Sequence, residues 1–138
     1  MEKYITGLYS FNDRFTRLQF VGYSLLNLAI SSILGLPLWL LSQTTNPGVA
    51  VLAAIGIIVV LGAGAWSNYA IMSKRLHDLG HGAINCIWIA LLDIGSSLME
   101  KVSPVLSMLF ALSLIGVMCY LVLKPGEIYH NRYGDSTI

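Results

Sequence analysis

Long apolar runs alternate with short polar segments along most of this chain. Three runs, 20–42, 49–72 and 104–123, contain no Asp, Glu, Lys or Arg. A fourth run, 83–99, is shorter and contains one acid, Asp93. A helix needs about 20 apolar residues to cross the hydrocarbon core of a bilayer, and in lipid its backbone groups must bond one another. The pattern therefore predicts four transmembrane helices.

The connections between these runs are short, so neighbouring helices are expected to run antiparallel. Residues 43–48 contain the turn signal Asn-Pro-Gly, and residues 100–103 form a tight polar turn. Segment 73–82 is charged and contains Gly80, a residue type that commonly ends a helix. We predict an all-α integral membrane protein, a single domain over 1–138 with four transmembrane helices in an antiparallel bundle.

The composition agrees with a membrane protein. The chain is 56% hydrophobic and 11% charged, whereas soluble domains carry about 25% charged residues. Its net charge of +1 gives no reason to expect a nucleic-acid partner. Both cysteines fall inside apolar runs, so we expect free thiols, and the charged first nineteen residues do not resemble a cleavable signal peptide.

The basic residues indicate the orientation in the membrane. If the apolar runs cross a membrane, only Lys101 lies at the run ends on one side of it. The other seven Lys and Arg lie at the run ends on the opposite side. Cytoplasmic loops are enriched in Lys and Arg, so both termini and segment 73–82 are predicted to be cytoplasmic. The seven are Lys3, Arg14, Arg17, Lys74, Arg75, Lys124 and Arg132.

Three polar segments at this cytoplasmic end form the candidate site. Segment 11–17 is expected to be an interfacial helical turn, capped by Asn12 or Asp13. Guanidinium groups match phosphate and carboxylate oxygens bidentately, so the arginines are expected to bind an anionic group. Neighbouring polar side chains would orient them. The site residues are Arg14, Arg17, Arg75, His77, Asp78, Asn131, Arg132 and Tyr133.

We assign no metal ligand, no cofactor and no catalytic residue. His77, Asp78 and His81 are close to the zinc motif H-E-x-x-H, but the acid is Asp and Gly80 interrupts the helix. The adjacent pair His77 and Asp78 is the one acid–base candidate, and neighbours on a helix point in different directions. An enzyme is therefore not expected, although the sequence leaves this open.

Three alternatives remain open at this stage. Asp93 either marks the outer end of its helix or acts as a relay acid in a small transporter or ion-translocating protein. The small residues of run 49–72 either pack inside the bundle or form a homodimer face. The polar segments either bind a ligand or only bind one another and close the bundle.

The three polar segments also resemble the signatures of a known family. Arg14-x-x-Arg17-x-x-Phe20, Arg75-Leu76-His77-Asp78-x-Gly80 and Asn131-Arg132-Tyr133-Gly134 are similar, in this order, to domain-of-unknown-function family 805. The family comprises small bacterial inner-membrane proteins, so the resemblance implies a multi-pass protein of that membrane. It implies no activity. Two departures are Asp13, where the family usually has Gly, and His81, where it tends to have Arg.

These observations favour a non-enzymatic membrane module. Its clustered cytoplasmic motifs would bind an anionic lipid headgroup or a small anion. A protein partner or a second copy of the chain is the other expected occupant, and no nucleic acid is expected.

Overall fold

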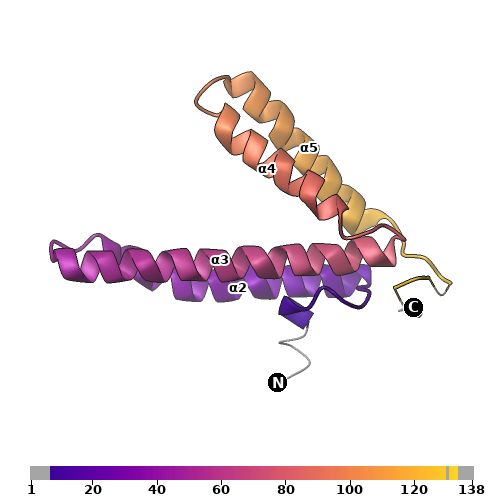
Figure 1. The fold of residues 1–138 in the computed structure, drawn as a ribbon, viewed down its shortest axis with the longest axis horizontal. Coiled ribbons are helices and arrows are strands. Elements are labelled where there is room, and N and C mark those ends of the chain that lie inside the picture. Colours follow the sequence, from indigo (N-terminus) through magenta and orange to yellow (C-terminus); the bar gives the residue numbers. More distant parts are fainter. Residues whose placement is uncertain (1–6, 130, 134–138) are drawn as a thin grey trace. The chain divides into compact units, whose positions relative to one another are not determined.

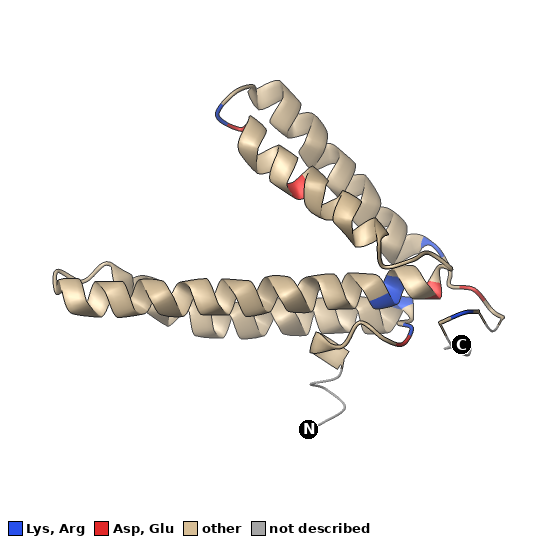
Figure 2. Cartoon of the chain, viewed as in Figure 1, with Lys and Arg blue, Asp and Glu red and all other residues tan. Residues whose placement is uncertain are grey.

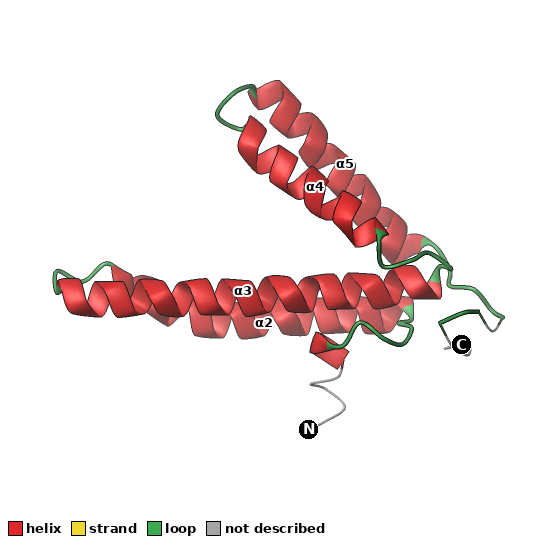
Figure 3. Ribbon diagram, in the orientation of Figure 1, coloured by secondary structure: helices red, strands yellow, loops and turns green. Residues whose placement is uncertain are grey.

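The structure is a computed structural model that describes residues 7–129 and 131–133. Lys3 and Gly134, which the sequence analysis used, lie outside the described residues. The described residues form helices joined by loops, with no β-sheet (Figure 3). The all-α prediction is confirmed at this level. The main helices are α2 (Arg17–Ser42), α3 (Pro47–Asp78), α4 (Asn85–Met99) and α5 (Pro104–Leu123), labelled in Figure 1.

Three of these helices, α2, α3 and α5, are long and apolar enough to cross a membrane. The helix α4 has 15 residues, or about 22 Å at 1.5 Å per residue, which is shorter than the roughly 30 Å hydrocarbon core. The apolar runs of the sequence match these helices. The helices α2 and α3 extend beyond the runs at their charged ends, where α2 begins at Arg17 and α3 continues to Asp78.

The chain divides into two compact units. The first comprises residues 1–10 and 22–71, and the second comprises residues 11–21 and 72–138. The single membrane domain expected from the sequence stays a prediction.

In the first unit, α2 and α3 form an antiparallel hairpin with close backbone contacts. The amide of Asn27 donates a hydrogen bond to the carbonyl of Gly64 at 3.0 Å. A Cβ atom at Gly56 would lie 3.1 Å from the Leu38 side chain. Small residues let helices approach closely where lipid provides no hydrophobic driving force. Gly56 and Gly64 of α3 therefore pack against α2.

The turn between α2 and α3 is the one that the sequence predicts. The Asn46 side-chain oxygen accepts hydrogen bonds from the backbone N–H groups of Gly48, at 3.0 Å, and Val49, at 3.4 Å. Asn46 thus caps α3, and Pro47 occupies the first helical position, where its missing N–H is no loss.

In the second unit, α4 and α5 form another antiparallel hairpin. The hydroxyl of Ser107 donates to the carbonyl of Ser96 at 2.9 Å, and the hydroxyl of Ser96 donates back to the carbonyl of Ser107 at 3.4 Å. Gly95 lies against the ring of Phe110, where a Cβ atom would come within 3.2 Å. Two hydroxyl–carbonyl bonds and one glycine contact therefore join the helices near the 100–103 loop.

One expectation about Asp93 is wrong. The helix does not end at this residue, because α4 continues to Met99. The hydroxyl of Ser97 donates to the carbonyl of Asp93 at 3.2 Å, one turn further along the same helix. Asp93 is exposed on the surface of α4. The short helix α4 therefore carries an exposed acid in the middle of its sequence and not at its end.

The start of α2 also differs from the prediction. Residues 11–16 are not helical, so no interfacial turn forms there. Neither Asn12 nor Asp13 caps the helix. The backbone N–H of Gln19 donates to the Thr16 hydroxyl at 3.2 Å, and the backbone N–H of Thr16 donates to the Gln19 side chain at 2.9 Å. This is a capping box, whose T-x-x-Q pattern was present in the sequence.

Asp13 adopts a backbone conformation that L-residues rarely use. Its φ is 81°, in the left-handed region, where glycine has no steric penalty. The bend lets the chain pass from residues 11–12 to Arg14 at the site. The Gly that the resembling family usually has at this position therefore has a physical reason.

Substitutions at Asp13 test this conformation. The neutral variants Asp13→Gly, Asp13→Asn and Asp13→Ala are expected to fall in stability in that order, since Gly is unstrained, Asn tolerates this region and Ala does not. The gap between Gly and Ala should be about 1–2 kcal/mol in the free energy of unfolding. Thermal unfolding of the purified protein in detergent measures it. All three variants lose the same charge, so an equal stability for Gly and Ala would contradict a strained backbone.

Candidate functional site

The second unit has a buried ionic core around one carboxylate. Asp78, at the end of α3, pairs with Arg75 one turn earlier on the same helix. Its other oxygen accepts from Arg14 Nη2 at 3.1 Å and Nε at 3.3 Å. The three side chains are at most 3% exposed. We call these residues the Arg14–Asp78–Arg75 triad.

Arg75 also completes the end of α5. Its Nε donates to the carbonyl of Leu121 at 2.8 Å, and its Nη2 donates to the carbonyl of Lys124. Arg17 donates to the carbonyl of Leu123 at 3.3 Å. The last carbonyls of a helix lack intrahelical partners, and cations are favourable there. Two arginines from other segments therefore cap α5.

Arg14 holds the segment that follows α5. Its Nη2 donates to the carbonyl of Glu127 at 2.6 Å, and its Nη1 donates to the carbonyl of Tyr129 at 3.1 Å. The backbone N–H of Glu127 donates in turn to the carbonyl of Asp78 at 2.8 Å. The tail is thus tied to the end of α3 by backbone groups as well as by charge.

The motif residues further along the tail contact His77. The Asn131 amide donates to the carbonyl of His77 at 3.0 Å and to the Glu127 carboxylate at 2.8 Å. The rings of His77 and Tyr133 are stacked, with centroids 3.8 Å apart and planes 7° apart. His77 Nδ1 also lies 3.3 Å from the carbonyl of Asp13. The predicted meeting of the three polar segments therefore occurs in the structure.

Two glycines make this close packing possible. Gly80 ends α3 with a φ of 76°, as predicted, and the N–H of His81 donates back to the carbonyl of Leu76 at 2.8 Å. The Glu127 carboxylate lies where a Cβ of Gly80 would be. Gly126 lies directly against the Asp78 carboxylate, leaving no room for a side chain.

A third buried cation adjoins the triad. Lys74 is fully buried, and its ammonium lies 4.7 Å from the centre of the Phe15 ring. The backbone N–H of Phe15 donates to the carbonyl of Lys74 at 3.1 Å. The charged side chains of this region comprise four cations, Arg14, Arg17, Lys74 and Arg75, and three carboxylates, Asp13, Asp78 and Glu127. Figure 2 shows charges near the start of α2 and the ends of α3 and α5.

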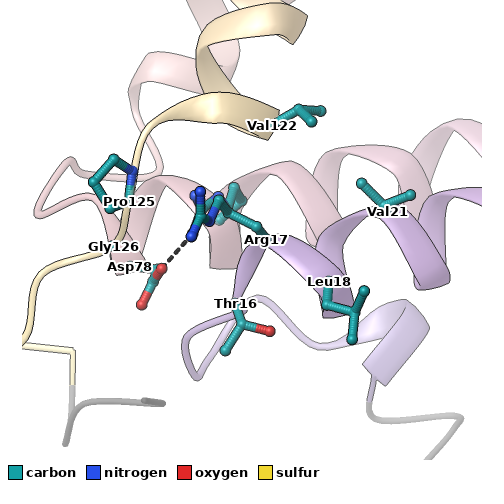
Figure 4. A pocket seen from close by; sticks show the side chains of 9 residues that line it. Thr16, Arg17, Leu18, Val21, Asp78, Val122, Pro125 and Gly126 are labelled. Carbon is teal, nitrogen blue, oxygen red and sulfur yellow. Dashed lines mark hydrogen bonds and ion pairs between the residues drawn. The ribbon is translucent and has the colours of Figure 1, made fainter.

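A pocket of about 580 Å³ opens beside the triad (Figure 4). The ion pair of Arg75 and Asp78 lines it, and Arg17 and Thr16 add polar groups. Apolar side chains of α2 and α5 line the rest: Leu18, Val21 and Val122, with Pro125 and Gly126 in the connecting segment. Arg17 is exposed, unlike Arg14 and Arg75. We call this cavity the Arg17 pocket.

The predicted site residues thus fall into two groups. Arg14, Arg75 and Asp78 are buried and bond protein groups, and His77, Asn131 and Tyr133 connect them to the tail. Arg17 and Arg132 are exposed. The guanidinium of Arg132 lies 4.8 Å from the centre of the Tyr133 ring. Anion binding by these residues stays a prediction.

Sequence reasoning missed several residues of the site. Glu127 and Gly126 contact Arg14 and Asp78, yet no motif marked them. The burial of Lys74 was also missed, because a lysine at a membrane boundary is normally solvated. Among residues 7–129 and 131–133, no three His, Cys, Asp or Glu side chains gather in a way that would hold a metal ion.

Comparison with known proteins gives one match. A family described as "Protein of unknown function (DUF805)" matches residues 8–135, nearly the whole chain. No curated protein and no solved structure matches.

Gly126→Ala tests the contact with Asp78. The added methyl group must displace the carboxylate, and breaking a buried ion pair costs about 3–5 kcal/mol. We expect a large drop in the midpoint of thermal unfolding. Gly116→Ala is the matched control in α5, because a Cβ there meets nothing within 4 Å and helix propensity improves. A similar loss for both variants would contradict the role of Asp78.

Arg14 and Asn131 should act as one unit on the tail. Both bind Glu127, so Arg14→Gln and Asn131→Ala should be coupled by roughly 0.5–3 kcal/mol in a double-mutant cycle of unfolding free energies. The stability change of Arg132→Ala, at the exposed neighbouring position, should simply add to that of either variant. Additive effects of Arg14→Gln and Asn131→Ala would show that the tail is not held jointly.

Proposed function

The chain belongs to the DUF805 family, and we propose that it is a non-enzymatic inner-membrane protein that binds the anionic headgroup of a lipid in the Arg17 pocket. The proposed topology has four spans in an antiparallel bundle with both termini in the cytoplasm. Three candidate spans, the shorter apolar helix α4 and the seven-to-one distribution of Lys and Arg support it.

The observation that carries the proposal is the different use of the arginines. Arg14 and Arg75 direct their N–H groups to Asp78 and to backbone carbonyls. Arg17 is exposed at the pocket and donates to the carbonyl of Leu123. A guanidinium has five N–H donors, so most of those on Arg17 can still bind oxygens of a ligand. The hydroxyl of Thr16 adds a further donor.

The pocket fits an anion better than a zwitterion. Two cations, Arg17 and Arg75, and one carboxylate, Asp78, line it, and the Asp78 carboxylate is already bound by two guanidinium groups. The ammonium of a zwitterionic headgroup would lie near Arg17, and the Asp78 carboxylate would not be available to bind it. Electrostatic complementarity of this kind mainly determines which partner is accepted.

The lining favours a lipid over a small soluble anion. Leu18, Val21 and Val122 line the pocket beside its polar groups. An alkyl chain can therefore lie along these side chains of α2 and α5 while its headgroup binds Arg17. The volume lies within the roughly 300–1,000 Å³ of small-molecule pockets. A protein partner, a second copy of the chain and a purely structural role of the motifs are the competing explanations.

Arg17→Gln tests the proposal. Gln keeps an N–H donor for the carbonyl of Leu123 but removes the charge. Charged hydrogen bonds contribute about 1.5–3 kcal/mol, so the preference for phosphatidylglycerol over phosphatidylcholine should fall about tenfold or more. Native mass spectrometry of the full chain released from nanodiscs of both lipids measures this. Arg17→Lys should restore part of the preference, and Lys101→Gln, at the opposite loop, should change nothing.

A second variant separates the pocket from the charge. Val122→Trp fills the apolar part of the pocket and leaves Arg17 in place, so it should also weaken phosphatidylglycerol binding. An unchanged preference in both Arg17→Gln and Val122→Trp would overturn headgroup binding in this pocket.

A further inference from the structure

A second group of polar side chains lies at the end of α5, outside the Arg17 pocket. The ammonium of Lys124 donates to the Tyr120 hydroxyl at 2.6 Å, and His81 Nε2 lies 3.2 Å from the same oxygen. The three side chains come from the loop after α3 and the last turn of α5. We call them the His81–Tyr120–Lys124 cluster.

This cluster faces away from the Arg17 pocket. Tyr120 and Val122 are two residues apart on α5, so their side chains point about 200° apart around the helix axis. Val122 lines the Arg17 pocket, and Tyr120 does not. Tyr120 and the Arg17 pocket therefore lie on opposite faces of α5.

The charges around the cluster are mainly basic. His81 is followed by Gly82, where a Cβ atom would lie 3.6 Å from Arg132 Nη2 and 3.3 Å from the Tyr133 hydroxyl. Arg132 is exposed. Glu127 lies against Gly80 and accepts from the Asn131 amide. Lys124, His81 and Arg132 thus surround the short 80–83 loop.

The cluster leaves several donors for a ligand. Lys124 uses one N–H on Tyr120, so two remain on its ammonium. The second ring nitrogen of His81 is also available in the tautomer or charge state that carries its proton. Exposed Ile84, 67% accessible, follows His81 by three residues and provides an apolar neighbour. Tyrosine and lysine at the end of a membrane helix lie at headgroup depth.

We propose that His81, Tyr120 and Lys124 form a second position for a lipid phosphate, on the face of α5 opposite the Arg17 pocket. Lys124 and His81 bind the phosphate oxygens, Tyr120 holds both side chains in place, and Arg132 adds positive charge beside the loop.

Counting bound lipid in the full chain tests this second position. Purified protein is delipidated in detergent and titrated with phosphatidylglycerol, and native mass spectrometry counts the lipids retained. We expect two for the wild type, one for Lys124→Met, one for Arg17→Gln and none for the double variant. Lys101→Met, a lysine in the α4–α5 loop, is the matched control and should retain two.

Each outcome distinguishes the two positions. If Lys124→Met retains as many lipids as the wild type, or if the double variant loses no more than either single one, the second position is overturned. If only Arg17→Gln is without effect, the Arg17 pocket fails and the second position stands. Tyr120→Phe should lower retention at an unchanged unfolding midpoint, whereas a purely structural cluster would lower the midpoint without changing retention.

A last arm identifies the source of the phosphate. Inorganic phosphate at millimolar concentration should not displace the lipid retained by Arg17→Gln, because Ile84 and the helix surface bind the acyl chain as well. Complete displacement would mean that the cluster binds free phosphate and not a lipid.

Discussion

The pairing of the Asp78 carboxylate with two arginines is the interaction on which the second unit depends. It receives guanidinium groups from two directions, Arg14 from the segment before α2 and Arg75 from its own helix. Removing two cations and one anion from water is expensive, and only good geometry with further hydrogen bonds offsets it. The arginines meet this requirement by donating to backbone carbonyls of α5, the tail and residue 15. One carboxylate thus organises three segments that are distant in the sequence.

This arrangement also explains why two of the arginines are left exposed. Asp78 has two oxygens, and both are used by Arg14 and Arg75. Arg17 and Arg132 stand at the edge of the cluster, where the protein offers them a carbonyl and an aromatic ring. The structural role of the inner arginines and the binding role proposed for the outer ones are therefore complementary, and the two readings of the motifs apply to different residues.

The apolar helices place few demands on specific side chains. Their contacts within each unit are made by glycines, by Asn27 on a carbonyl and by the serine pair of α4 and α5. Such contacts are the means by which helices associate where both sides are equally apolar. Asp93 is the exception, since it is exposed within a short apolar helix.

The sequence by itself determined the helices and the segments that meet. Apolar runs of sufficient length must be helical in lipid, Asn46-Pro47 is a local cap, and Gly80 ends α3 because it adopts a positive φ without strain. Each of these depends on neighbours in the chain. The convergence of the three motifs also followed from the sequence, because short loops place the same ends of the helices together.

Only the tertiary structure decided which charges are buried. Arg14 and Arg17 look alike in the sequence, yet one binds Asp78 and the tail while the other faces the pocket. Their roles depend on how close each arginine lies to residues 78 and 127, and the local sequence pattern does not contain these distances. The bend at Asp13 and the contact of Gly126 with Asp78 have the same origin, since both exist to bring separate segments together around one carboxylate.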